Sequence, residues 1–323
     1  MLEEKLSSYA LKNSSKHKIK KIKAGLVGCG SIGQEIAVLI AKEGIELTFI
    51  EVSEEKIKES LKNIGETIDH IINRWGMTAG DKRAILSRIK GSLSYEDLKD
   101  CSIVIEAINT KKWTPKQITR KDVFSNIEKH VGRDCVIASN ASTIVISDLS
   151  VALKYPDRAI GVHFISPTLK THIIEMNICS QTSPATIKFI KKFAATIEKE
   201  VIEVAGAPGN ISTRLIVAMI NEACELLMEG VAEVPEIDKT MMRGYGMQIG
   251  PFGLADRIGL DKLVKWMEGL YSEYGNPKYK TSPLIKRMVR AGMLGNECGE
   301  GFYFYKPDGT RYKKIGSVLT LGH

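Results

Sequence analysis

A histidine and a glutamate on two neighbouring predicted strands have the residue types and spacing for acid–base chemistry. His163 lies near the carboxyl end of the strand predicted over 159–164, and open α/β sheets hold their ligands at this end. Glu175 follows 12 residues later, on the strand predicted over 172–178. A carboxylate beside a histidine fixes the tautomer of the imidazole and raises its basicity. Ser139 ends another predicted strand and offers a hydroxyl to the same edge, so we predict an acid–base site there.

A glycine-rich turn early in the chain has the pattern of a dinucleotide site. Residues 28–33 read Gly-Cys-Gly-Ser-Ile-Gly, between a strand predicted over 22–28 and a helix predicted over 31–43. Such glycines allow a tight turn and a close approach to pyrophosphate, which the helix N-terminus attracts. Glu51, at the end of the next predicted strand, would accept both ribose hydroxyls and repel a 2′-phosphate, which favours NAD over NADP. The predicted cofactor-binding residues here are Gly28, Cys29, Gly30, Ser31, Ile32, Gly33 and Glu51.

Strands and helices alternate through the first two thirds of the chain, which is typical of a parallel sheet wound with helices. The strands are predicted over 22–28, 46–52, 102–108, 135–140, 159–164, 172–178 and 201–204. The helices between them are predicted over 31–43, 53–75, 78–89, 122–129 and 184–200. The long pair 53–75 and 78–89 is expected to project as a helical hairpin.

Small and turn residues over 205–210, Ala-Gly-Ala-Pro-Gly-Asn, end the strand-bearing half of the chain. Beyond them the pattern is helical, apart from a short aromatic strand near 302–305. We therefore predict an α/β fold, with a Rossmann-like parallel-sheet N-terminal domain followed by an all-α C-terminal domain. The predicted parts are a basic extension over 1–21, an NAD-binding domain over 22–207, a helical domain over 208–305 and a tail over 306–323.

Composition and charge exclude several classes of protein. The 323 residues are 43% hydrophobic, and the apolar runs are far shorter than the roughly 18 residues that a membrane span needs. The net charge of +8 resides at the two ends, 1–23 and 306–323, so the chain between them is formally neutral and nucleic acid is not an expected partner. The six cysteines lack metal-ligand spacing, so no metal is expected. The cysteines look reduced, as in an intracellular protein, and the N-terminus lacks a signal-peptide core, so we predict a cytoplasmic protein.

Several blocks of sequence together resemble the 3-hydroxyacyl-CoA dehydrogenase family, especially its short 3-hydroxybutyryl-CoA dehydrogenases. The blocks are GLVGCGSIGQEIA, CSIVIEAI, IASNAST, GVHFISP, GPFGLADRIGLD, SPLIKRMVRAGMLGN and GEGFYFY, and they extend over about 22–305. The resemblance implies a Rossmann-like domain followed by a helical domain that forms a homodimer. It also implies NAD-dependent, reversible oxidation of a short-chain L-3-hydroxyacyl-CoA to the 3-oxoacyl-CoA.

The resemblance also assigns roles to individual residues. His163 matches the catalytic histidine, Glu175 the glutamate that orients it, and Ser139 a serine that contacts the substrate hydroxyl. Thr213 stands where the family has a substrate-contacting asparagine. The residues that match contacts to the coenzyme A arm are Thr67 and Arg74. The residues that match further contacts to the cofactor are Ile108, Asn109, Lys112, Ser139 and Ser166.

The chain departs from the family pattern at four places near this site. Ser166 and Thr213 replace asparagines, and Glu297 replaces a lysine. The acid that the family has soon after Glu-Ala-Ile is missing, since Asn109 and the residues after it stand there instead. The segment that begins at Asn109 is also several residues longer than in the family. Two alternatives to the leading interpretation therefore stay open. One is a dehydrogenase of free 3-hydroxy acids, and the other is an NAD-binding relative with weak or no activity.

Overall fold

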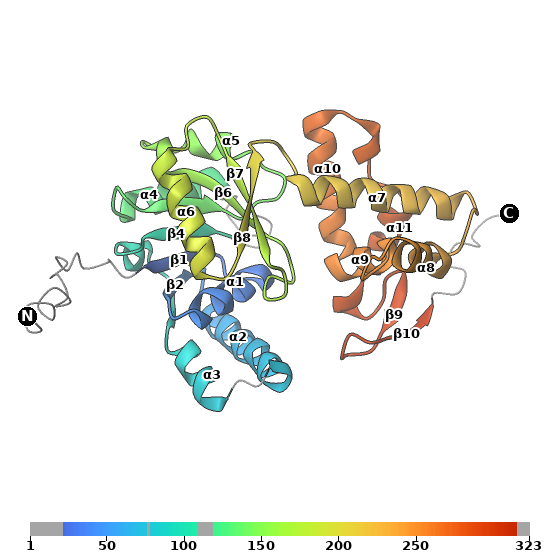
Figure 1. The fold of residues 1–323 in the computed structure, drawn as a ribbon, viewed down its shortest axis with the longest axis horizontal. Coiled ribbons are helices and arrows are strands. Elements are labelled where there is room, and N and C mark those ends of the chain that lie inside the picture. Colours follow the sequence, from blue (N-terminus) through green and yellow to red (C-terminus); the bar gives the residue numbers. More distant parts are fainter. Residues whose placement is uncertain (1–21, 76–77, 109–118, 315–323) are drawn as a thin grey trace, which may run out of the picture.

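The fold consists of an α/β domain and a helical domain that lie side by side (Figure 1). The structure is a computed structural model that describes residues 22–75, 78–108 and 119–314. The α/β domain holds an eight-stranded sheet in the order β3-β2-β1-β4-β5-β6-β7-β8. Its strands are β1 Lys23–Val27, β2 Glu46–Ile50, β3 Ile89–Ser92, β4 Ile103–Glu106, β5 Val136–Ser139, β6 Ala159–Phe164, β7 Ile173–Ile178 and β8 Glu200–Ala205.

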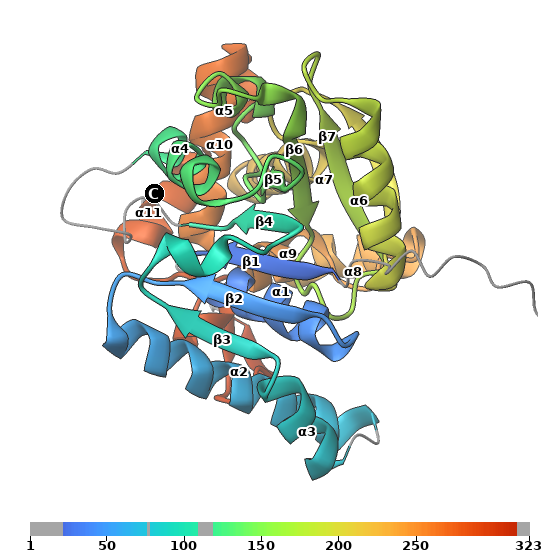
Figure 2. The ribbon, with the colours of Figure 1, turned by 90° about the vertical axis from the view of Figure 1, so that its left-hand side faces the viewer.

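The direction of the strands places the candidate catalytic residues. Neighbouring strands run parallel from β3 to β6, and β7 runs antiparallel to β6 and parallel to β8. Figure 2 shows the twisted succession of β3, β2, β1 and β4. In the β6–β7 pair, His163 stands directly opposite Glu175. Opposed residues in an antiparallel pair point to the same face, so the register itself brings imidazole and carboxylate together.

The helices of the α/β domain cover both faces of the sheet. Their bounds are α1 Ser31–Lys42, α2 Glu54–Trp75, α3 Ala79–Leu86, η2 Tyr95–Leu98, α4 Arg120–His130, α5 Ile146–Ser150, η3 Pro156–Arg158 and α6 Pro184–Thr196. One core contains residues of α1, α2 and α6, and a second contains residues of α4 and α5. Side chains of a strand alternate between these cores: Leu26 lies in the first and Val27 in the second. Burial on both faces explains why the central strands are almost continuously apolar.

The helical domain has a separate hydrophobic core and ends in a two-stranded hairpin. Its elements are α7 Ile211–Met228, α8 Val234–Gly244, α9 Pro251–Ile258, α10 Leu260–Tyr274, η4 Pro277–Tyr279, α11 Pro283–Arg290, η5 Asn296–Cys298, β9 Tyr303–Tyr305 and β10 Arg311–Lys314. The buried carboxylate of Asp256 accepts the backbone N–H groups of Phe302 and Tyr303 and the hydroxyl of Tyr305, at 2.8–2.9 Å. α9 and the hairpin are thereby joined.

The predicted fold class is confirmed, and two local predictions were wrong. The helix predicted over 78–89 ends at Leu86, and Ile89 begins β3. This strand has four residues, Ile-Lys-Gly-Ser, and its Gly91 lies so close to Ile57 that a Cβ there would collide with that side chain. Such a short strand is defined by its pairing with β2, not by a local pattern. The segment beyond 305, predicted as a tail, contributes β10, which pairs with β9.

Candidate active site

The candidate acid–base pair is buried and hydrogen-bonded. Nδ1 of His163 lies 2.8 Å from Oε2 of Glu175, and both side chains are buried. An ionised carboxylate only accepts hydrogen bonds. Nδ1 of His163 therefore carries a proton and donates the hydrogen bond to Glu175. In the neutral imidazole, Nε2 is then the unprotonated ring nitrogen. In this tautomer the imidazole can take a proton from a bound molecule and Glu175 can stabilise the resulting charge.

Glu175 also binds the first turn of α7, across the junction between the two domains. Its Oε1 accepts the backbone N–H groups of Ile211 at 3.0 Å and Ser212 at 2.8 Å, and its Oε2 accepts the Ser212 hydroxyl at 2.7 Å. The residue before this helix, Asn210, makes no side-chain cap, so a carboxylate from β7 satisfies the free N–H groups. Burial acts to raise the pKa of Glu175, but the hydrogen bonds from His163 and Ser212 outweigh it and lower that pKa.

The glycine turn has the shape that a pyrophosphate needs. Gly28 has a φ of +94°, and a Cβ at Gly33 would overlap the carbonyl oxygen of Gly28. Gly30, in contrast, has open space where a Cβ would stand, so packing within the protein does not require this glycine. Gly30 also precedes α1 without a side-chain cap, and Ser31 and Ile32 follow it in the first helical turn. Open space beside uncapped N–H groups fits a bound phosphate.

Glu51 lies beside this turn and accepts two backbone hydrogen bonds. Its Oε1 accepts the N–H of Cys29 at 2.7 Å, and its Oε2 accepts the N–H of Val52 at 3.2 Å. These bonds hold the carboxylate next to the glycine turn, where the ribose of a dinucleotide is expected. Burial raises the pKa of the Cys29 thiol to about 12, so this cysteine is a neutral part of the turn.

Ser139 belongs to a buried network that sequence reasoning did not predict. Its hydroxyl donates to Oε2 of Glu106 at 2.7 Å and accepts the N–H of Ala141 at 3.1 Å. Glu106 is fully buried at the end of β4 and pairs with Arg120, which also donates to the carbonyl of Ile108 at 2.8 Å. The sequence signal that could have indicated this network is the glutamate that ends the otherwise apolar run Ser-Ile-Val-Ile-Glu. The hydroxyl proton of Ser139 is therefore already engaged, and its contact with substrate stays a prediction.

The loop after His163 is held from two sides by residues that sequence reasoning also missed. Glu35 accepts the Thr168 N–H at 2.5 Å and the Ser166 hydroxyl at 3.4 Å. On the other side, the buried ammonium of Lys199 donates to the carbonyls of Thr168, at 2.8 Å, and Thr171. Burial lowers the pKa of Lys199. The loop that carries the predicted cofactor contact Ser166 is thus anchored next to α1.

The remaining predicted residues lie in several places. Thr213, in the first turn of α7, is buried, and its hydroxyl has no hydrogen-bond partner. Thr67 is half-buried on α2, and Arg74 is on the same helix, with its side chain outside the described residues. Asn109 and Lys112 lie outside the described residues. Glu297 forms an exposed ion pair with Lys262 at 3.0 Å.

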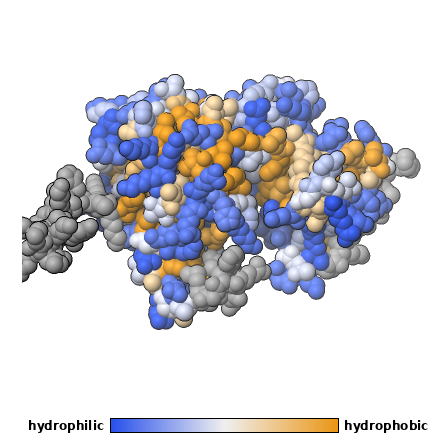
Figure 3. Space-filling view, in the orientation of Figure 1, coloured by the Kyte–Doolittle hydropathy of each residue, from blue (hydrophilic) through white to orange (hydrophobic). Residues whose placement is uncertain are grey.

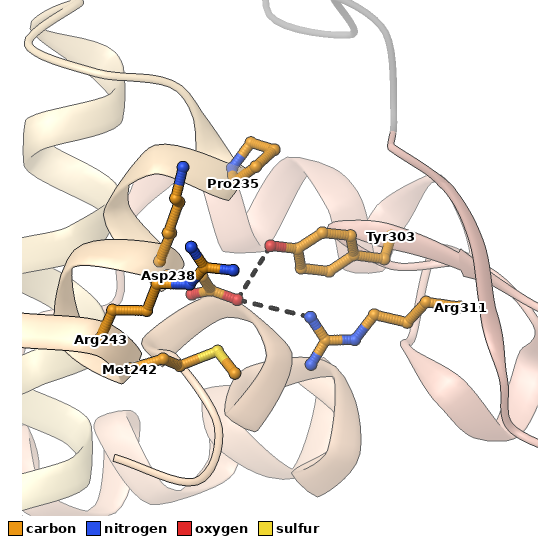
Figure 4. A pocket seen from close by; sticks show the side chains of 7 residues that line it. Pro235, Asp238, Met242, Arg243, Tyr303 and Arg311 are labelled. Atoms are coloured by element: carbon orange, nitrogen blue, oxygen red, sulfur yellow. Dashed lines mark hydrogen bonds and ion pairs between the residues drawn. The ribbon is translucent and has the colours of Figure 1, made fainter. Parts of the chain in front are cut away.

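A cavity in the helical domain contains other charged groups (Figure 4). Its buried carboxylate, Asp238, accepts the N–H groups of Phe252 and Gly253 and the Tyr303 hydroxyl, at 2.8–3.0 Å. Arg311 of β10 lies 3.7 Å from the same carboxylate and stacks over the Tyr303 ring. The carboxylate is thus fully engaged in holding α8, α9 and the hairpin together, which is a structural role.

Comparison with known proteins identifies the family. A family model described as the NAD-binding domain of 3-hydroxyacyl-CoA dehydrogenase matches residues 23–207, and one described as its C-terminal domain matches 209–305. The chain is 34% identical to a probable 3-hydroxybutyryl-CoA dehydrogenase of Deinococcus radiodurans, over 88% of this chain and 100% of that protein. It is 31% identical to the 3-hydroxybutyryl-CoA dehydrogenase of Clostridioides difficile, over 88% of this chain and 99% of that one.

A solved structure agrees with the family models. The crystal structure of the (S)-3-hydroxybutyryl-CoA dehydrogenase of Ralstonia eutropha superposes with a TM-score of 0.78. It has 37% sequence identity with this chain and covers 88% of this chain and 99% of its own. Both domains, in the same order, are therefore shared with solved relatives. The chain belongs to the 3-hydroxyacyl-CoA dehydrogenase family of NAD-dependent oxidoreductases.

Proposed function

We propose that this protein oxidises a short-chain L-3-hydroxyacyl-CoA to the 3-oxoacyl-CoA with NAD, and that the reaction is reversible. The observation that carries the proposal is the buried His163–Glu175 hydrogen bond of 2.8 Å, in a chain of this family. The short acyl chain is inferred from the relatives, which are named 3-hydroxybutyryl-CoA dehydrogenases.

The acid–base steps follow from the tautomer of His163. When bound, NAD supplies the nicotinamide ring that accepts a hydride from C3 of the substrate. Nε2 of His163 takes the proton of the 3-hydroxyl group, while Nδ1 remains hydrogen-bonded to Glu175. The carboxylate stabilises the imidazolium that forms. In the reverse direction, the imidazolium returns this proton to the 3-oxo oxygen.

The proposed contacts to the two ligands involve separate sets of residues. Residues 28–33 would hold the pyrophosphate of NAD and Glu51 its ribose, as the open space at Gly30 supports. Ser139 and the unpartnered hydroxyl of Thr213 would contact the substrate near C3. The proposed contacts to the nicotinamide half are Ile108, Asn109, Lys112, Ser139 and Ser166. The proposed contacts to the coenzyme A arm are Thr67 and Arg74.

We place the boundary between the NAD-binding domain and the helical domain between residues 207 and 208. We further propose that the protein forms a homodimer through the helical domain. Leu215 and Met228 on α7 and the following Val231 are exposed by 67%, 46% and 64%, and apolar residues are visible along α7 in Figure 3. Exposed apolar faces of this kind favour association. A cytoplasmic location is also proposed, supported by the buried thiols of Cys29, Cys101 and Cys224, which form no disulfide. In the described part of the chain, the helices are too short or too polar to cross a membrane.

The direct test is oxidation of NADH by the purified protein with acetoacetyl-CoA. Wild type should turn over, and His163→Gln should lose about 10³-fold in kcat because the general base is removed. Equal rates for the two proteins would contradict the assigned role of His163. NAD binding without turnover would instead support a catalytically inactive relative.

A second candidate is a dehydrogenase of free 3-hydroxy acids. It is favoured by the hydroxyl of Thr213, which stands where the family has an asparagine and has no partner in this structure. Competition by free coenzyme A separates the two candidates. Inhibition by millimolar coenzyme A is expected for an acyl-CoA substrate, and its absence together with turnover of 3-hydroxybutyrate would favour the free acid.

A further inference from the structure

We propose that Ser212 is a positioning residue that sets the basicity of His163 by sharing one carboxylate oxygen of Glu175 with it. This inference rests on the proposed function of the His163–Glu175 pair and adds a third member, contributed by the helical domain. Ser212 lies in the segment after Pro-Gly where the chain departs from the family pattern.

The geometry places two donors on a single oxygen. Oε2 of Glu175 is 2.8 Å from Nδ1 of His163 and 2.7 Å from the hydroxyl of Ser212. The carboxylate can only accept, so both the imidazole N–H and the serine O–H donate to it. The backbone N–H of Ser212 donates to the other oxygen, Oε1, at 2.8 Å. Ser212 thus binds both oxygens of the carboxylate and fixes the plane in which it faces His163.

The second donor has a predictable electrostatic effect. A hydrogen bond to a carboxylate stabilises its negative charge. The same bond reduces the charge that Oε2 can offer to a protonated imidazole. The hydroxyl of Ser212 therefore favours the state with neutral His163 and ionised Glu175 over the state with protonated His163. A neutral imidazole is the form that accepts the substrate proton, so Ser212 keeps the base active at lower pH.

The other elements around Glu175 leave this effect undisturbed. From β6, the titratable group that faces the carboxylate is His163. On β8, the residue opposite Glu175 is Ile202, and its neighbour Glu203 forms an ion pair with Lys191. On α7, the guanidinium of Arg214 is directed to the ring of Tyr274 and the hydroxyl of Tyr279.

The contact also crosses the junction between the domains. Glu175 is on β7 of the sheet, and Ser212 is in the first turn of α7. The His163–Glu175 pair is formed within the sheet, but its third member, Ser212, is in place only when the helical domain lies against the sheet as it does here. We infer that the position of α7 and the protonation of His163 are coupled through this hydroxyl.

The test is an NMR titration of the histidine ring signals, which needs no turnover. The His163 signal is assigned by its absence in His163→Gln. Ser212→Ala should raise the apparent pKa of His163 by about half to one unit, and Ser212→Thr, which keeps the hydroxyl, should restore the wild-type value. Ser212→Cys has a weaker donor, so its His163 pKa should lie between the values of wild type and Ser212→Ala. This variant replaces Ser212→Ala in the test if the alanine variant folds poorly. Equal apparent pKa values in wild type and Ser212→Ala or Ser212→Cys would overturn the proposal.

A matched control and a kinetic readout complete the experiment. Ser183 also stands at a helix N-terminus, where its hydroxyl accepts the N–H of Thr186 at 3.2 Å, but the bonds that hold Glu175 do not involve it. Ser183→Ala should lower the Tm without moving the His163 titration. With NAD and a 3-hydroxyacyl-CoA, the direction in which neutral His163 is the base, Ser212→Ala should move the acid limb of the kcat profile to higher pH with little change in KM. A wild type without turnover would refute the proposed function alone, because the titration still decides the role of Ser212.

Discussion

His163 and Glu175 are direct cross-strand neighbours in the antiparallel pair formed by β6 and β7. The register of this pair, and not a flexible loop, fixes the hydrogen bond of 2.8 Å between their side chains. Side chains positioned by paired strands stay close to a productive geometry. The relationship makes the consequences of single substitutions specific enough to test.

Glu175→Gln should lower both activity and stability. The amide removes the negative charge that stabilises the imidazolium, so kcat should fall by about 10²-fold or more. It also leaves fewer acceptors for the N–H groups of Ile211 and Ser212 and the Ser212 hydroxyl, so Tm should fall. Glu297→Gln, which alters only an exposed ion pair, is the control and should change neither by much. A Glu175→Gln variant with wild-type kcat would contradict the acid–base assignment.

Ser139→Ala should reveal whether its hydroxyl serves the substrate or the fold. The loss of its bond to the buried Glu106 should cost about 1–3 kcal/mol of the unfolding free energy. If Ser139 also contacts the substrate, kcat should fall more than for Ser142→Ala, the nearest half-buried serine of the same segment. Steady-state kinetics of both variants decide this. A larger loss of kcat in Ser142→Ala would transfer the substrate contact to Ser142.

Glu51→Gln should weaken NAD binding and relax cofactor choice. The amide keeps one acceptor for the Cys29 N–H but loses the charge that repels a 2′-phosphate. We expect KM for NAD to rise about tenfold and the preference for NAD over NADP, measured as a ratio of kcat/KM, to fall. Glu54→Gln, a change in the first turn of α2, is the matched control. An unchanged ratio would argue against Glu51 as the ribose-binding residue.

Most of the fold was predictable from the sequence because the central strands are buried on both faces and carry the apolar signal of such strands. The His163–Glu175 pair was predictable because both residues fall on such strands. β3 was not, because its four residues become a strand only by pairing with β2. The roles of Glu106, Arg120 and Ser212 depend on contacts between segments distant in sequence, and periodicity carries no information about such contacts.

Arg120→Met should be strongly destabilising, because it leaves the carboxylate of Glu106 buried without its ion-pair partner. Breaking a buried pair from one side typically costs about 3–5 kcal/mol. The double variant Glu106→Gln/Arg120→Met should recover part of this loss, since the buried charge is gone. Arg133→Met, which removes an exposed pair with Asp157, should cost less than about 1 kcal/mol. Chemical denaturation measures the unfolding free energies of wild type and of these variants. Similar losses of unfolding free energy in Arg120→Met and Arg133→Met would contradict the expectation.

Asp256 should make stability fall as pH rises from about 4 to about 6. Burial raises its pKa from 3.8 to about 6, against the hydrogen bonds that it accepts from Phe302, Tyr305 and Tyr303. The native state therefore keeps a proton that the unfolded state has lost in this range, so the contribution of Asp256 declines by about 3 kcal/mol across it. Below about 4 both states hold the proton, and above about 6 the loss is complete.

The measurement is the unfolding free energy of wild type and Asp256→Asn at several pH values. At about pH 4 the variant should be less stable than wild type, because its amide cannot accept the N–H of Tyr303 and the hydroxyl of Tyr305 together. Its curve should lack the decline between pH 4 and 6, so the gap between the two proteins should narrow as pH rises. Asp308→Asn, in an exposed turn, should keep the wild-type decline. Parallel curves for wild type and Asp256→Asn would show that this carboxyl group does not titrate in that range.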